Sequence, residues 1–427
     1  MKLIALSTEQ APPLSVPLRF FAVAPLFLAL AALLLLARDG GNPFSNTHTP
    51  ALLAATHSIT LGFISMIMLG ALQQILPVVI GSSLHTPRLV AWVSQLSLVA
   101  GTLLLSFGFS AGRPELLNLA WPLLGLGFAT FSSAALSSLA RAAVHNASKT
   151  AIMLSLLALL GAVVLGMQLT QGYASGQMIA PQFAAAHVSL ALGGWVLLLI
   201  VGVSYQVVPM FQLTPGYPRW LTLVLGPAIF LALLLQLVLP LFDGASGWAE
   251  FAAGNLFWLG AIIFSVATLK LQQQRRRRIP DATLTFFRIA LLALLGVAVL
   301  AMAAQNFDFP EAVRILGGLL FVTGFALSLI YGMLYKIVPF LIWFHLFRGG
   351  SFHSIPNMKE IIPEHWMWRH VWLHAATLAA ALLAPWWDNA ARLFIMCLLL
   401  QSLLLGYVMF SAIAIYRRTL KRLEQAT

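Results

Sequence analysis

Charge and cysteine are what this sequence has least of. Charged residues make up 8% of its 427 positions, and only 12 of them are acidic, against 24 lysines and arginines. A soluble globular domain carries about three times that charged fraction, which excludes a water-soluble enzyme or binding module. The single cysteine, Cys397, lies within an apolar run and excludes an internal disulfide framework.

Apolar residues make up 60% of the chain. Runs of about 20 of them, the length that crosses a bilayer, recur from end to end. We therefore expect an all-α polytopic membrane protein, a single transmembrane domain over residues 1–427 with about twelve transmembrane helices. The expected spans lie near residues 17–37, 52–80, 89–111, 116–140, 150–172, 182–211, 219–241, 248–271, 284–304, 312–346, 369–387 and 391–416.

The basic residues are distributed unevenly between the two ends of these spans. All but five of the 24 lysines and arginines fall on the side of the N-terminus, and one of the five, Lys336, lies within a span. Cytoplasmic loops are enriched in such residues, so we expect a bacterial-type inner (cytoplasmic) membrane with both termini cytoplasmic. The His353 loop would also be cytoplasmic, and His48 and Asp243 would face outside. Membrane lipid is then the expected partner of the arginine run 275–278, and nucleic acid is not.

One pattern of glycines and proline occurs three times. Two glycines eight residues apart precede a proline by fifteen and seven residues, in the sets Gly62, Gly70, Pro77; Gly194, Gly202, Pro209; and Gly324, Gly332, Pro339. Copies this evenly spaced indicate a four-span unit used three times, as pseudo-repeats 17–140, 150–271 and 284–416. On a straight helix the three positions share one face, and small residues there let helices in lipid approach closely.

Two of the three repeated helices carry a histidine near their start, His57 and His187. An imidazole within lipid needs partners for its ring nitrogens, either a metal or haem iron, or a hydrogen bond to a threonine or a backbone carbonyl. Counted back from the first repeat glycine, His57 is five residues away and His187 seven. At about 100° per residue their directions differ by roughly 160°, which predicts two separate centres, or one centre and one structural histidine, rather than one shared ion.

The third copy has no histidine at this place and carries two basic residues instead. Arg314 lies just outside the span, where it can pair with haem propionates or serve as an ordinary interfacial charge. Lys336 lies near the other end, where we expect its side chain to extend to the membrane surface. Further metal-binding candidates are His48 in an external loop, and His370 with His374, whose spacing of four suits a metal pair. Solvation of His48 and interfacial placement of the other two are the alternatives.

At these residues the chain resembles the haem–copper oxidase subunit I superfamily, which has twelve spans in three pseudo-repeated arcs. The pattern H-x4-G-x7-G-x6-P of residues 57–77 is most similar to the NnrS branch, haem- and copper-containing membrane proteins linked to nitric oxide. The resemblance implies that His57 is a haem ligand on the second span. It implies that His187 matches the ligand associated with copper on the sixth.

The chain also departs from that family. It lacks the adjacent histidine pair of the seventh span, the His-x-His of the tenth and the tyrosine motif of the sixth. The oxygen-reducing centre cannot be assembled in the usual way without those groups. We expect a haem-binding protein, with copper as a further candidate cofactor, that acts in electron transfer or nitric oxide chemistry. A periplasmic electron-transfer protein or a membrane subunit would be its partner.

Two other classes of function remain open. Three homologous units enclose spaces between helices, so a transporter or insertion factor for a small solute or for haem is the alternative. The third class is a metal-free subunit that keeps the scaffold for assembly. An oxidoreductase is the enzyme class that the resemblance implies, and the sequence does not decide whether the chain is an enzyme.

Overall fold

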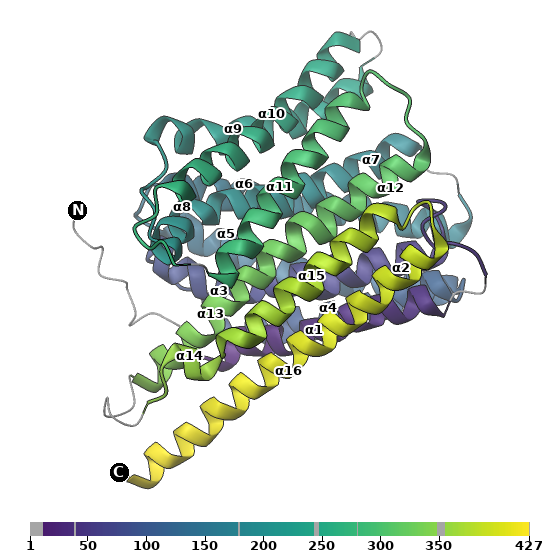
Figure 1. Cartoon of the computed structure of the whole chain (residues 1–427). Coiled ribbons are helices and arrows are strands. Elements are labelled where there is room, and N and C mark those ends of the chain that lie inside the picture. The colour runs from purple at the N-terminus through teal and green to yellow at the C-terminus, as the bar shows by residue number, and fades with distance from the viewer. Residues whose placement is uncertain are drawn as a thin grey trace. The chain divides into compact units, whose positions relative to one another are not determined.

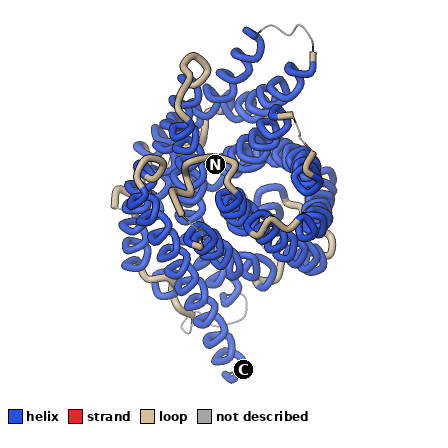
Figure 2. Tube along the Cα trace, turned by 90° about the vertical axis from the view of Figure 1, so that its right-hand side faces the viewer, coloured by secondary structure: helices blue, strands red, loops and turns tan. Residues whose placement is uncertain are grey.

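The computed structural model describes residues 12–37, 40–177, 180–242, 247–279, 281–347 and 355–426. These ranges contain helices and short connections but no strand (Figure 2). Eleven helices among them are long and apolar enough to cross a membrane. The expectation of an all-α polytopic membrane protein is therefore confirmed. Asp243 and the His353 loop lie outside the described residues.

The helix expected near 369–387 is not among these eleven, because it is less apolar than they are. It is present as α15 (Glu364–Leu383), a regular helix of 20 residues. Its first half, EHWMWRHVWLH, holds three histidines, an arginine and a glutamate. The polar side chains lower its mean hydropathy without breaking its helical hydrogen bonds.

The chain folds as two compact units. The first contains residues 71–278 and 291–310, and its complete helical elements are α4 (Pro87–Ser110), α5 (Pro114–Arg141), α6 (Ala147–Ser175), α7 (Pro181–Val188), η3 (Ser189–Leu197), α8 (Leu198–Gln212), α9 (Arg219–Val238), η4 (Leu239–Leu241) and α10 (Gly247–Gln273). The second contains residues 13–70, 279–290 and 311–427, with α1 (Ser15–Leu36), α2 (Pro50–His57), η2 (Ser58–Ser65), α12 (Glu311–Leu319), η5 (Leu320–Leu327), α13 (Ser328–Phe347), α14 (Met358–Ile361), α15 and α16 (Asp388–Ala426). Two further helices, α3 (Met66–Ile80) and α11 (Ala282–Ala303), contribute to both units.

In the second unit, α16 packs along both α1 and α15, and its C-terminal end extends past α14 (Figure 1). The long helix α16 thus packs against both α13 and α15. Fully buried polar side chains lie on these three helices: Ser328, His370, His374, Thr377 and Gln401.

Each of the three repeated helices is interrupted by a π-helical segment at the same place. The segments η2, η3 and η5 contain Gly62, Gly194 and Gly324, the first glycine of each copy. A π-helix closes its turns with i→i+5 hydrogen bonds and is rare, so three at one offset support the repeat strongly.

The π segments lie in the stretches over which the angle between the two histidines was counted. His57 directly precedes η2, and His187 lies two residues before η3. The turn of about 100° per residue holds only for an α-helix, and neither stretch between histidine and glycine is one. Both stretches contain a π segment at nearly the same place, so the value of roughly 160° stays untested, and separate centres remain a prediction.

The glycines of the repeat provide close packing, as expected. Gly70 faces Phe20 on α1, Gly202 faces Ala151 on α6, and Gly332 faces Phe286 on α11. A Cβ atom added at these glycines would lie 2.7, 2.6 and 3.0 Å from the Cβ atoms of those residues. In every copy the repeated helix thus packs against the helix that precedes it through the second glycine of the pattern.

An ion pair in the second unit gives Lys336 a partner. Its ammonium donates at 2.9 Å to Oδ2 of Asp281, the residue directly before α11, and the expected position at the membrane surface stays a prediction. Burial of Asp281 opposes its ionisation, but the charge and hydrogen bond of Lys336 and two hydrogen bonds from Thr283 outweigh it. The pKa of Asp281 therefore lies below its ordinary value.

Candidate functional site

His57 ends α2 and is half-buried in the second unit. Its Nδ1 atom lies 2.8 Å from the carbonyl oxygen of Leu53, one turn earlier in the same helix. A carbonyl oxygen only accepts, so Nδ1 carries the proton and the lone pair of the neutral ring is on Nε2. This is the tautomer in which imidazole binds a metal through Nε2 while a backbone carbonyl orients the ring.

His187 belongs to the first unit and is oriented differently. Its Nδ1 lies 2.8 Å from the carbonyl oxygen of Ala162 on the neighbouring helix α6. Gly166, one turn further along α6, makes room for the ring, since a Cβ there would lie 2.9 Å from His187 Cε1. The contact ties two helices together, which is the structural role that the sequence left open. The same hydrogen bond also leaves the lone pair on Nε2, so the ligand prediction stays a prediction.

Arg314 and His48 come together at one end of the second unit. Both side chains are exposed, and each lies close enough to Glu311 to act on its charge. Glu311 accepts hydrogen bonds from the backbone N–H of Thr47 at 2.8 Å and from its hydroxyl at 2.9 Å. These bonds connect the loop that leads into α2 with the first turn of α12, the helix that carries Arg314.

His370 and His374 are completely buried in the protein, so neither side chain contacts lipid headgroups or solvent as the interfacial alternative had expected. At 1.5 Å rise per residue they lie about 9 and 15 Å from the start of α15, well inside the helix. The exposed His365, beside Trp366, fits the interfacial reading instead. Because lipid offers no partner to a polar side chain, two buried imidazoles need a complete set of partners inside the protein.

Those partners come from α13, α15 and α16. The side-chain oxygen Oε1 of Gln401 lies 3.3 Å from His370 Nε2 and 2.8 Å from His374 Nδ1. The ring nitrogen of each histidine that faces away from Gln401, called its outer nitrogen, contacts a hydroxyl group. The Tyr335 hydroxyl oxygen lies 2.7 Å from His370 Nδ1, and Ser328 Oγ lies 2.6 Å from His374 Nε2. All four ring nitrogens therefore take part in hydrogen bonds. We call this set of five residues the histidine network.

Aromatic rings surround the two imidazoles. The ring of Tyr331 lies 4.3 Å from that of His370 and 5.4 Å from that of His374, measured between centroids. Phe286 lies 5.4 and 5.7 Å from the same two rings, and Tyr335 lies 5.7 Å from His370. The hydroxyl of Tyr331 is buried and has no hydrogen-bond partner among the described residues.

The sequence carried signals for this network that the search for metal ligands passed over. His370, His374 and Thr377 follow one another at spacings of four and three, which places three polar side chains on one face of an apolar helix. Tyr335, four residues before the repeat proline, corresponds to Tyr205 and Gln73 in the other copies, all of them buried and polar. Gln401 is a lone amide within an apolar run and has no such pattern.

The described residues contain no group of three or more histidines, cysteines, aspartates or glutamates arranged to hold a metal ion. The metal assignments of His48, His187, His370 and His374 therefore rest on sequence alone and stay predictions.

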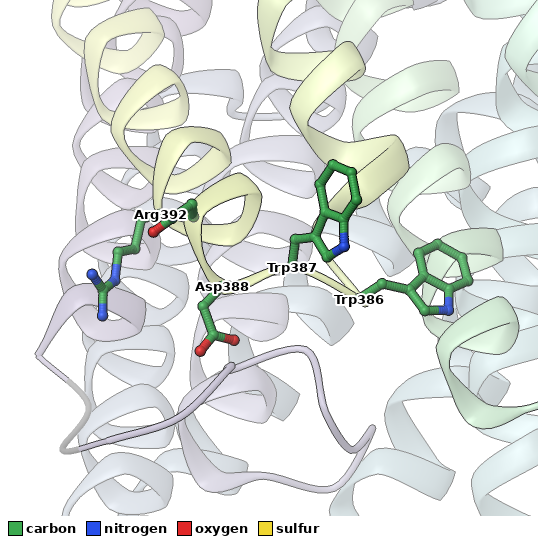
Figure 3. A pocket seen from close by; sticks show the side chains of 5 residues that line it. Trp386, Trp387, Asp388 and Arg392 are labelled. Carbon is green, nitrogen blue, oxygen red and sulfur yellow. The ribbon is translucent and has the colours of Figure 1, made fainter.

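An open depression of about 510 Å³ lies at the turn between α15 and α16. Figure 3 shows its lining side chains pointing in different directions, with the indoles of Trp386 and Trp387 apart from Asp388 and Arg392. The two tryptophans are 49% and 63% exposed. Side chains that diverge do not form a binding site, and tryptophans so exposed at a helix end suit a membrane interface.

No family model matches the chain, and no curated protein shows significant similarity to it.

Proposed function

We propose that this chain is a haem-binding integral membrane protein in which His57 would hold the haem iron. The observation that carries the proposal is the hydrogen bond from His57 Nδ1 to the Leu53 carbonyl, which puts the ring's lone pair on Nε2. A histidine in this state is the commonest protein ligand of haem iron.

The position of His57 adds support. It directly precedes η2, and π segments within helices are found frequently at functional sites. The bonds between Thr47 and Glu311 keep the entrance to its helix beside the helix of Arg314. A guanidinium near that entrance suits the carboxylates of haem propionates, whose planar groups match its fork of donors.

The donor set favours haem over a copper ion held by protein alone. The porphyrin itself supplies four nitrogen ligands, so haem needs only one or two side chains. Copper without such a ring needs a larger cluster of histidine or cysteine side chains, and the part of the chain that the structure describes has no such group. Copper stays a second proposal, attached to His187.

A haem bound at His57 would supply one-electron chemistry or a site for a diatomic gas. This chain's own residues would orient it, through His57, and neutralise its propionates, through Arg314. The proposal includes an inner-membrane location with cytoplasmic termini, because the basic residues follow that topology. A periplasmic electron-transfer protein, or another membrane subunit, would then be the partner on the side of His57.

The test is the optical spectrum of the purified full chain, expressed with haem synthesis supported. We expect haem bands that change with dithionite and are lost or strongly reduced in His57→Ala. His345→Ala is the matched control, because His345 Nδ1 also bonds the carbonyl one turn earlier, Leu341, at 2.9 Å. Loss of a half-buried helix histidine as such would affect both variants, whereas loss of a ligand affects only the first.

The variant His187→Ala tests whether the two units hold separate centres. We expect it to leave the bands that depend on His57 in place. Identical loss of one chromophore in both variants would show a shared site. A colourless wild-type protein with intact helices would overturn the haem proposal and favour the transporter or assembly classes.

A further inference from the structure

The histidine network allows its protons to be assigned from chemistry alone. Thr377 donates its hydroxyl proton to the carbonyl of Leu373 at 2.8 Å, so it must accept the bond from Gln401 Nε2 at 2.6 Å. That fixes the amide of Gln401 with its oxygen toward both imidazoles. An amide oxygen only accepts. His370 Nε2 and His374 Nδ1 therefore both carry protons.

The two imidazoles then differ at their outer nitrogens. His370 is satisfied as a neutral ring, because Tyr335 donates its hydroxyl proton to Nδ1. At His374 the hydroxyl of Ser328 lies 2.6 Å from Nε2 and also 2.6 Å from the carbonyl oxygen of Gly324. One hydroxyl proton cannot serve both short contacts well. With both rings neutral, the network has one proton fewer than the number of its short hydrogen-bond contacts.

We propose that the histidine network is a proton-binding site, and that the added proton resides on His374. With Nε2 protonated, His374 donates to Ser328 Oγ, and Ser328 turns its own proton to the Gly324 carbonyl. Every contact then has a proton, and one proton has been added with no other bond made or broken. His370 is not the site, because a proton on its Nδ1 would leave the Tyr335 hydroxyl without a described acceptor.

Aromatic rings lie against both imidazoles. The ring centroids of Tyr331 and Phe286 are within about 6 Å of both, the distance at which an aromatic ring can attract a positive charge, and this attraction would offset part of the cost of burying one. The titratable neighbours are Tyr331 and Tyr335 on α13, and the thiol of Cys397 on α16, beside Thr377. Among the described residues no carboxylate is hydrogen-bonded to the network, so the site is neutral at rest.

Protonation would act on the π segment. Ser328 follows η5 directly, and Gly324 is the repeat glycine inside it. Proton uptake at His374 ends the competition of Nε2 for the hydroxyl proton of Ser328, so that this proton is committed to the Gly324 carbonyl. A single proton thereby changes the hydrogen bonding of a helix that holds one of the three π segments, whether or not haem is bound elsewhere.

The experiment measures histidine protonation by infrared difference spectroscopy, between pH 8 and pH 4, on the full chain in lipid vesicles with labelled histidine. We expect an imidazolium component that is absent in His374→Gln and retained in His365→Gln, a change at the exposed histidine of the same helix. Ser328→Ala should lower the proton affinity of this component by about 10- to 100-fold, because the charge-assisted bond from Nε2 is lost.

The residue Gln401 provides a test that does not need His374 to be replaced. Gln401→Glu puts an anion beside both rings and should raise the proton affinity by about 10- to 1,000-fold. Gln401→Leu removes the shared acceptor and should lower it. A histidine signal unchanged in a folded His374→Gln, or equal shifts in the two Gln401 variants, would overturn the proposal.

Discussion

A methyl group added at Gly202 tests whether the repeat glycines hold helices together. The Cβ of Gly202→Ala would lie 2.6 Å from the Cβ of Ala151 on α6, whereas apolar carbons pack at about 3.5–4.0 Å. Both atoms are attached directly to backbone, so no rotamer change can relieve the contact and α8 must move away from α6 by about 1 Å. Overpacking of this kind costs about 1–3 kcal/mol.

The gain in helix propensity from glycine to alanine, up to about 1 kcal/mol, acts in the opposite direction. Gly317→Ala measures that gain alone, because nothing lies within 4 Å of the Cβ position at Gly317 on α12. We therefore expect the free energy of unfolding of Gly202→Ala to be about 1–3 kcal/mol lower than that of Gly317→Ala. Unfolding by sodium dodecyl sulfate of the protein in mixed micelles gives both values.

The double variant Gly202→Ala, Ala151→Gly makes the comparison specific. It exchanges the glycine and the alanine across the contact, so the clash disappears while the number of methyl groups stays the same. We expect a favourable coupling energy of about 1–3 kcal/mol between the two sites. Additive effects, with a coupling below about 0.5 kcal/mol, would refute direct packing as the role of this glycine.

Two further predictions concern topology and pH. Reporter fusions at residues 46 and 275 should report opposite sides of the membrane, because the basic residues are so unevenly distributed; the same side for both would contradict the orientation. The ion pair of Asp281 with Lys336 should stabilise the fold fully above the ordinary pKa of an aspartate, since the folded pKa is lowered, and this contribution should disappear as the pH falls through the folded value. Lys336→Met should remove that part of the pH dependence of unfolding between pH 6 and pH 3, and an unchanged profile would show that the pair contributes nothing.

Much of the architecture could be predicted because lipid constrains it. Long apolar runs give the spanning helices, and the glycine and proline spacing identified the three repeated helices before their π segments were known. The π segments themselves could not be predicted. A π turn has no signature in composition, and these turns lie between each histidine and its repeat glycine, where the comparison of His57 with His187 assumed α-helical rotation.

The histidine network was missed for a different reason. His370 and His374 were recognised as a pair, but their burial depends on Gln401 and Tyr335, which lie 27 or more residues away in the chain. Proximity to charged and tryptophan-rich sequence favoured an interfacial position. In the fold α15 turns its histidine face toward α13 and α16, and only tertiary contacts determine which face that is.

The three π segments also carry information about ancestry. Each begins within two residues of the same offset from its repeat glycine, in helices about 130 residues apart. Three independent insertions at one offset would require three coincident events, whereas one insertion in a single ancestral unit requires only one. A single ancestral unit that already had the irregular turn would account for all three, whereas His57 and His187 lie at different offsets from their glycines and point to no common origin of the histidines.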